Sequence, residues 1–111
     1  MSLLDVDAAL ALPPDQAVAA LISLPEDQWF DRKSGRIAAK NLARPLVAFA
    51  NAEGGTLAIG LRDGEVDGVS AKAENAIRQA PIDFTVPPVH AHTSSIEVGG
   101  TSILILSLIH I

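Results

Sequence analysis

The chain has 111 residues, of which 49% are apolar, none is cysteine, and the formal net charge is −5. This length allows one domain, and the apolar share is that of a globular protein and excludes a disordered one. The lack of cysteine excludes disulfides, thiolate metal sites and a thiol nucleophile, and it fits the reducing cytoplasm, where we expect the protein. The first apolar run carries Asp5 and Asp7 and no base, unlike a signal peptide. The run SILILSLIHI is too short to span a bilayer as a helix, so we expect no membrane partner.

The basic residues are concentrated in one segment of this acidic chain. Residues 1–31 hold six acids and no Lys or Arg, whereas residues 32–44 hold no acid and five of the eight cations. These five are Arg32, Lys33, Arg36, Lys40 and Arg44. Because salt confines the influence of a charge to roughly 10 Å, such a segment can attract phosphate locally. The alternative is an ordinary solvated helix face.

The first predicted elements are a helix and a strand. Residues up to Ala11 are weakly patterned, and Pro13-Pro14-Asp15 then opens a helix, DQAVAALISL, which Pro25 ends. QWFDRKS follows as an extended strand that Gly35 breaks. Alternation places Trp29 and Asp31 on one face of this strand and Phe30 and Arg32 on the other.

The next predicted element is a helix from residue 36 to residue 52. Arg36, Lys40 and Arg44 are spaced i, i+4 and i+8, so one continuous helix would present them on a single side. Pro45 complicates this, because a proline inside a helix costs about 3 kcal/mol. Either the helix kinks there, or its regular part begins at Pro45, and in that case the cations form no clean row.

The second half of the chain predicts a strand, a turn, a helix and a hairpin. TLAIGL is a nearly continuous apolar strand, expected to be central, RDGE is a turn, and VDGVS is a short strand or hairpin arm. AKAENAIRQA is a helix that Pro81 ends, and VHAHTSSIEV and TSILILSLIHI pair around Gly99-Gly100. This order predicts an α+β fold, with helices packed on a mixed β-sheet.

The apolar end of the sequence leaves two alternatives open. The run ILILSLI forms either a core strand or a sheet edge, and an exposed edge of this kind would pair with a second copy. We therefore expect a homodimer. Because a domain seldom stops on such a run, we also expect SLIHI to be an artificial end or the point where a longer protein continues into a downstream domain.

A long central motif carries a family resemblance. LVAFANAEGGTLAIGLRDGEVDGV, residues 46–69, resembles the Schlafen/AlbA DNA-binding domain family. The matching features are the helix end Ala48-Phe49-Ala50-Asn51, the pair Gly54-Gly55, an apolar strand to Gly60, Asp63-Gly64, and Gly68. Upstream, Glu26, Asp31 and Lys33 match an acid-x4-acid-x-lysine pattern, although Asp31 stands where the family usually has glutamate. The resemblance covers roughly residues 15–108 of a single domain, residues 1–111.

The resemblance implies a fold more firmly than an activity. Bacterial members look like N-terminal modules of transcriptional regulators, often followed by a helicase-like or ATPase-labelled region. Vertebrate relatives cleave RNA with three carboxylates. For a nuclease the resemblance nominates Glu26, Asp31 and Asp63 to hold Mg or Mn, with Lys33 facing phosphate. The structural alternative is that Glu26 and Asp27 cap a turn, Asp31 pairs with Lys33 or Arg36, and Trp29 is core.

The binding interpretation needs fewer residues. The five clustered cations supply phosphate contacts, and Trp29 offers a stacking surface to an unpaired base. No helix-turn-helix or P-loop is present, so neither sequence readout nor nucleotide binding is indicated. Gly54-Gly55 is a helix stop that Asn51 braces. His90 and His92 share a strand face without a third metal ligand.

The sequence therefore predicts a DNA- or RNA-binding module of a bacterial transcriptional regulator. The alternatives are a metal-dependent endoribonuclease and a structural dimerisation module without activity.

Overall fold

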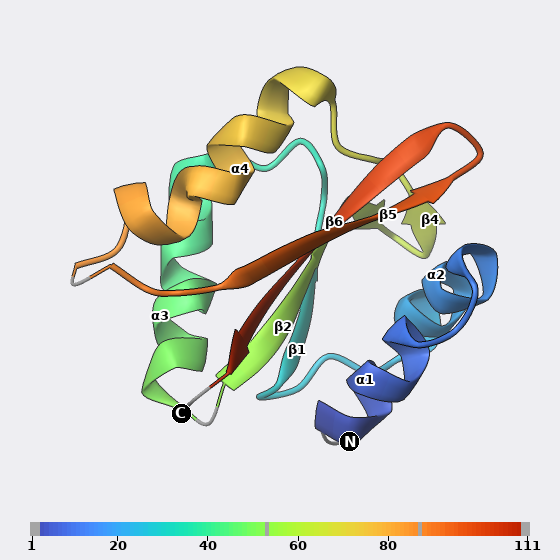
Figure 1. Ribbon diagram of the computed structural model, residues 1–111, viewed down its shortest axis with the longest axis horizontal. Helices are drawn as coiled ribbons and strands as arrows, with labels where there is room; N and C mark the ends of the chain where they lie inside the picture. Colours follow the sequence, from blue (N-terminus) through green and yellow to red (C-terminus); the bar gives the residue numbers. More distant parts are fainter. Residues whose placement is uncertain (1–2, 53, 87, 110–111) are drawn as a thin grey trace.

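The computed structural model describes residues 3–52, 54–86 and 88–109 as a mixed β-sheet between two helical layers (Figure 1). In these residues the sheet has the strand order β1-β2-β6-β5, and a small separate hairpin pairs β3 with β4. The predicted α+β class is confirmed. The elements are α1 (Leu3–Leu10), α2 (Pro14–Ser23), β1 (Phe30–Lys33), the 3-10 helix η1 (Ala39–Leu42), α3 (Ala43–Asn51), β2 (Gly54–Ile59), β3 (Leu61–Arg62), β4 (Glu65–Val66), α4 (Ala71–Asp83), β5 (His92–Val98) and β6 (Thr101–Ile109).

The first two helices form one layer. The sequence before residue 11 predicted no element, yet α1 spans it and buries Val6 and Ala9, which are three residues apart. The buried positions described for this helix, Val6 and Ala9, are too few to give a recognisable period. Helix α2 begins at Pro14, where the missing amide costs nothing, and ends before Pro25 as predicted.

The connection from β1 to α3 differs from the predicted long helix. The chain turns after Lys33, forms η1, and enters regular α-helix at Ala43, so Pro45 is the third residue of α3. A proline in the first helical turn removes no intrahelical hydrogen bond. The prediction of one helix from residue 36 is therefore wrong, and the alternative of a start near Pro45 is correct to within two residues.

Strand β2 is central, as predicted from TLAIGL. Every one of its residues is buried, with β1 parallel on one side and β6 antiparallel on the other. Gly60, with φ of +113°, ends the strand and starts the β3–β4 hairpin. The predicted strand in VDGVS is shorter and earlier, because β4 covers only Glu65 and Val66.

Helix α4 extends past the proline that was expected to end it. Ser70 caps its start by accepting a hydrogen bond from the amide of Ala73, and Pro81 lies inside the helix, buried. The helix continues because a proline deletes only one amide bond and Pro81 packs in the core. The carbonyl of Pro81 then accepts hydrogen bonds from the Thr85 hydroxyl and the Val89 amide.

The last two strands form the predicted hairpin. Gly99 and Gly100, with φ of +57° and +78°, make the two-residue turn between β5 and β6. Strand β6 pairs with β2 on one side and β5 on the other, so it is an interior strand. The suggestion that ILILSLI forms a sheet edge is wrong, and residues 110–111 of SLIHI lie outside the described residues.

Two hydrophobic layers hold the helices to the sheet. Helices α3 and α4 pack on one face through Leu46, Phe49 and Ile77 against β2 and β6 (Figure 1). Helices α1 and α2 pack on the other face through Val6 and Leu21, together with the fully buried Phe30 of β1. Across the described ranges, every helix falls short of the length and apolarity that a membrane span requires.

Candidate nucleic-acid interface

Strand β1 is an edge strand, and the segment before it covers its free backbone groups. The amide of Asp27 donates to the carbonyl of Phe30 (3.0 Å), and the amide of Arg32 donates to the Glu26 carboxylate (2.7 Å). The Asp27 carboxylate accepts a hydrogen bond from the Trp29 amide (2.8 Å) and fixes the intervening turn. A bare strand edge offers such groups to other chains, so Glu26 closes this edge of the sheet.

Glu26 and Asp31 bring two carboxyl groups together beside an ammonium group. Asp31 and Lys33 share one face of β1, as predicted, and their side chains pair at 3.0 Å. The hydrogen bond to Asp31, followed by burial, raises the pKa of Glu26. Burial disfavours the charged form of Asp31, but hydrogen bonds with Glu26 and Lys33 outweigh it and lower the pKa of Asp31. Of the two carboxyl groups, Glu26 is therefore the one that takes up a proton more readily, and Asp31 is the one whose charged form is favoured.

Asp63, the third nominated carboxylate, does not complete a metal site. It lies in the β3–β4 turn with an 88% exposed side chain and pairs with Arg62 at 3.5 Å. It borders a groove of about 360 Å³ that Glu26 and Lys33 also line. No three histidine or acidic side chains lie close enough to hold a metal ion within the described residues, so the side chains present do not fit Mg or Mn there. The same result leaves the pair His90 and His92 without a metal site.

A second groove, of about 480 Å³, separates the start of β1 from the outer side of α3. Its walls combine apolar side chains with three carboxylates, and none of its described lining residues is basic. These residues are Glu26, Asp27, Gln28, Phe30, Asp31, Pro45, Ala48, Phe49 and Ala52. A polyanion is repelled from such a groove unless cations accompany it.

The Arg32 side chain lies on the face of β1 that packs against α2. Its guanidinium donates from Nη1 to the carbonyls of Leu21 (2.8 Å) and Leu24, and lies 5.3 Å from the centre of the Phe30 ring. It thus satisfies backbone acceptors at the end of α2. The predicted strand alternation already placed Arg32 on the face of Phe30. The sequence did not indicate that the carbonyls at the end of α2 would accept its hydrogen bonds.

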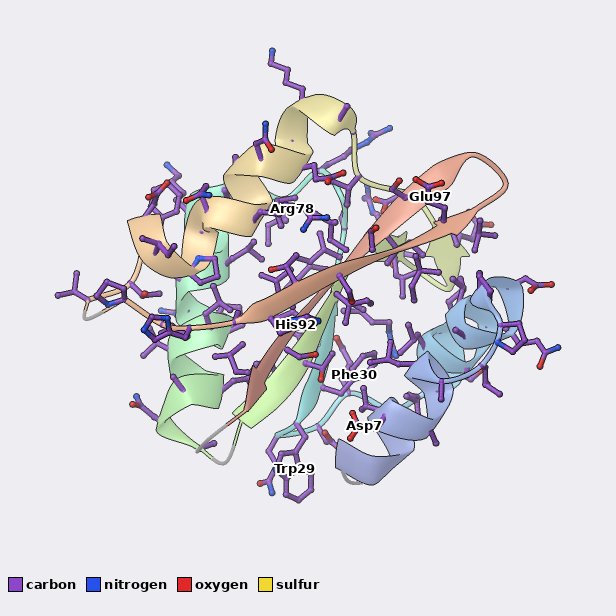
Figure 2. The ribbon with its side chains drawn as sticks, viewed as in Figure 1. Asp7, Trp29, Phe30, Arg78, His92 and Glu97 are labelled. Atoms are coloured by element: carbon purple, nitrogen blue, oxygen red, sulfur yellow. The ribbon has the colours of Figure 1, made fainter. Side chains whose placement is uncertain are left out.

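The remaining cations spread along the crossover from β1 to α3. Arg36, Lys40 and Arg44 are exposed, in the turn after β1, in η1 and in the first turn of α3 respectively. Trp29 is only part-buried and precedes β1, at the end away from this segment (Figure 2). Strand β1 separates Trp29 from the crossover by roughly 13 Å, so base stacking and phosphate contact would occur at different places.

Three glycines meet where β1 and β2 end. A Cβ on Gly35 would lie 1.6 Å from the carbonyl oxygen of Gly68, and one on Gly60 would lie 3.2 Å from the Gly68 Cα. The Ser34 hydroxyl and the Gly35 amide donate to the Asp67 carboxylate and hold the junction. Sequence reasoning gave Ser34 and Asp67 no role. Their signal was the paired Ser-Gly and Asp-Gly dipeptides, which are typical of turns.

The second glycine motif packs against α3. The helix ends at Asn51, which is exposed, and β2 begins at Gly54, with φ of +104°. A Cβ on Gly55 would lie 2.3 Å from the Phe49 ring. The helix thus ends before the predicted glycine stop, with Ala52 as its C-cap, and both glycines belong to β2, where Gly55 lets the helix approach the sheet closely.

Comparison with known families identifies this architecture. The family model described as Schlafen, AlbA_2 matches residues 26–110, which include the β1 edge, the crossover and both glycine motifs. The chain belongs to the Schlafen, AlbA_2 family. Among curated proteins, none matches the chain.

Two solved bacterial structures share the fold of this Schlafen, AlbA_2 domain. The N-terminal domain of a RecG-related protein from Nitrosomonas europaea superposes with a TM-score of 0.60 at 17% identity, over 84% of this chain and 72% of that one. The DIP2311 protein from Corynebacterium diphtheriae gives a TM-score of 0.60 at 18% identity. That match covers 97% of this chain but 26% of the other, so the present chain corresponds to a small part of that protein.

Proposed function

We propose that this domain binds nucleic acid through the phosphate backbone, with Arg36, Lys40 and Arg44 as the principal contacts. The observation that carries the proposal is the exposure of all three cations on one continuous crossover of an otherwise acidic protein. Lys33, at the start of the same segment, adds a charge that Asp31 partly neutralises. Contacts of this kind give affinity for DNA and RNA alike and carry no sequence information.

The acidic groove beside α3 limits the path of the nucleic acid. Glu26, Asp27 and Asp31 line that groove, whereas Arg36 and Lys40 lie beyond the other end of β1. A bound strand therefore runs over the crossover and away from the carboxyl pair. Arg32 makes no phosphate contact in this arrangement, because its guanidinium is held by the carbonyls of α2.

The wider role we propose is that of a module in a bacterial transcriptional regulator. Family membership and a fold neighbour described as related to a DNA helicase support an association with nucleic acid. Both structural neighbours come from bacteria.

A metal-dependent endoribonuclease is the second candidate function. The observation that favours it is the interaction of Asp31 with both Glu26 and Lys33, the three residues of the acid-x4-acid-x-lysine pattern. The high exposure of Asp63, and the lack of three clustered metal ligands among the described residues, count against it. Structured RNA incubated with manganese separates the two functions: cleavage that Asp31→Ala abolishes would establish the nuclease, and intact RNA would leave binding alone.

The binding proposal is tested by fluorescence anisotropy with labelled single-stranded and duplex DNA and RNA. The triple variant Arg36→Ala, Lys40→Ala, Arg44→Ala is expected to lose most of the affinity. Lys72→Ala removes an exposed cation from α4 and serves as the matched control with affinity unchanged. Equal loss in both variants, or no binding by the unmodified chain, would contradict the proposal.

A further inference from the structure

The backbone groups at the two edges of the sheet differ in whether other residues cover them. At β1, Glu26 and Asp27 occupy the outward amide and carbonyl groups. At the other edge, β5 offers seven residues, His92–Val98, all of them part-exposed or exposed. Figure 1 shows no element in front of β5, and the strand carries no proline or lysine and only one acid, Glu97. It therefore lacks the usual devices that prevent strand addition.

The hairpin register identifies the free groups of β5. Val98 and Thr101 close the two-residue turn, so they form a hydrogen-bonded pair, and such pairs alternate along the strands. Thr93, Ser95 and Glu97 then direct their amides and carbonyls outward. Ser102 provides a check, because it is opposite Glu97 and its carbonyl turns away from β5 to accept the Val69 amide at 2.8 Å.

We propose that β5 pairs antiparallel with β5 of a second copy, around a two-fold axis at Ser95. Only residues whose amides and carbonyls face outward can hydrogen-bond between the two β5 strands. This requirement limits the registers in which the two strands can pair. Centring on Ser95 uses the whole strand, because Ser95 is the middle residue of His92–Val98. The two four-stranded sheets then join into one continuous sheet.

The side chains of β5 suit this register. It places Glu97 opposite Thr93 of the second copy, where the threonine hydroxyl can donate to the carboxylate, and it keeps the two Glu97 side chains apart. On the other face it places His92 opposite Val98 and Ser94 opposite Ile96. Figure 2 shows His92 and Glu97 at opposite ends of β5, as this pairing requires. The predicted homodimer thus uses β5, and not the interior strand β6.

Cysteine cross-linking tests both the dimer and its register, because the chain contains no cysteine. Directly opposed hydrogen-bonded residues have Cα atoms about 5.5 Å apart, which a disulfide can bridge. Under mild oxidation, Ser95→Cys is expected to form a covalent dimer rapidly. Thr93→Cys is the matched control on the same strand, and it stays monomeric in denaturing gels because it is opposite Glu97 of the second copy.

Sedimentation velocity supplies the independent readout. The unmodified chain is expected to sediment as a dimer, and Ser95→Pro as a folded monomer, because proline removes only an outward amide; circular dichroism verifies the fold. A monomeric unmodified chain at every accessible concentration would overturn the proposal. So would a dimer that persists in Ser95→Pro, or faster cross-linking of Thr93→Cys than of Ser95→Cys. Both experiments are carried out without nucleic acid, so a failure of the dimer is distinguished from a failure of nucleic-acid binding.

Discussion

Replacing Arg32 with alanine should destabilise the fold and leave nucleic-acid binding by the folded protein intact. The guanidinium bridges β1 to the end of α2 through the carbonyls of Leu21 and Leu24, and it lies against the Phe30 ring. Alanine leaves both carbonyls without this donor in a part-buried place. The effect of the change is therefore on the free energy of unfolding and not on the phosphate-binding surface.

The expected loss follows from these contacts. A hydrogen bond from a charged donor contributes about 1.5–3 kcal/mol, and because one nitrogen serves both carbonyls we take about 2 kcal/mol for the pair. A cation over an aromatic ring adds about 0.5–1 kcal/mol. Together these give a loss of about 2.5–3 kcal/mol, a large part of the stability of a small domain.

Urea unfolding followed by circular dichroism measures this loss as a lower midpoint at unchanged slope. Arg36→Ala, at an exposed cation four residues later, is the control and should change stability by less than about 0.5 kcal/mol. A loss below about 1 kcal/mol in Arg32→Ala would refute the bridging role. If folded Arg32→Ala loses nucleic-acid affinity in the absence of urea, then Arg32 contacts phosphate.

Two further predictions concern the β1 edge and the glycine junction. Because the pKa of Glu26 is raised above its ordinary 4.5, the folded state holds that proton more tightly than the unfolded chain, and stability should fall as pH rises above about 4.5. Glu26→Gln should flatten this decline, seen as unfolding midpoints that no longer drop as pH rises above about 4.5. An unchanged slope would show that Glu26 holds no proton more tightly in the folded state. Gly35→Ala should cost roughly 3 kcal/mol or more, because its Cβ would meet the backbone of Gly68. Gly64→Ala, with open space around its Cβ, should cost only the left-handed backbone penalty of about 1–2 kcal/mol, and equal thermal shifts in the two variants would refute the close approach.

The strands and the turns were predictable because their signals are local. TLAIGL is apolar apart from Thr56, and a strand buried on both faces needs such a nearly continuous apolar composition. Gly99-Gly100 between two alternating runs defines a two-residue hairpin. The acid–x–lysine spacing placed Asp31 and Lys33 on one face, and their ion pair follows from the pleat.

The remaining features depend on contacts between distant segments. Arg32 resembles the other cations in the sequence, and only the position of α2 next to β1 separates it from them. Nothing local indicates that β6 is covered on both sides and β5 on one, because strand order is a global property. The exposed position of Asp63 at the rim of the groove that Glu26 lines likewise depends on how the β3–β4 hairpin folds against the sheet.

The salt dependence of nucleic-acid binding shows whether the cations of the crossover meet phosphate. Each phosphate contact neutralised by a cation contributes roughly −0.9 to the slope of log affinity against log salt on duplex DNA, and roughly −0.7 on single strands. The triple variant at Arg36, Lys40 and Arg44 should therefore have a slope shallower by about 2 to 3 than the unmodified chain, while Lys72→Ala retains the full slope. An unchanged slope in the triple variant would show that the crossover is not the surface that meets phosphate.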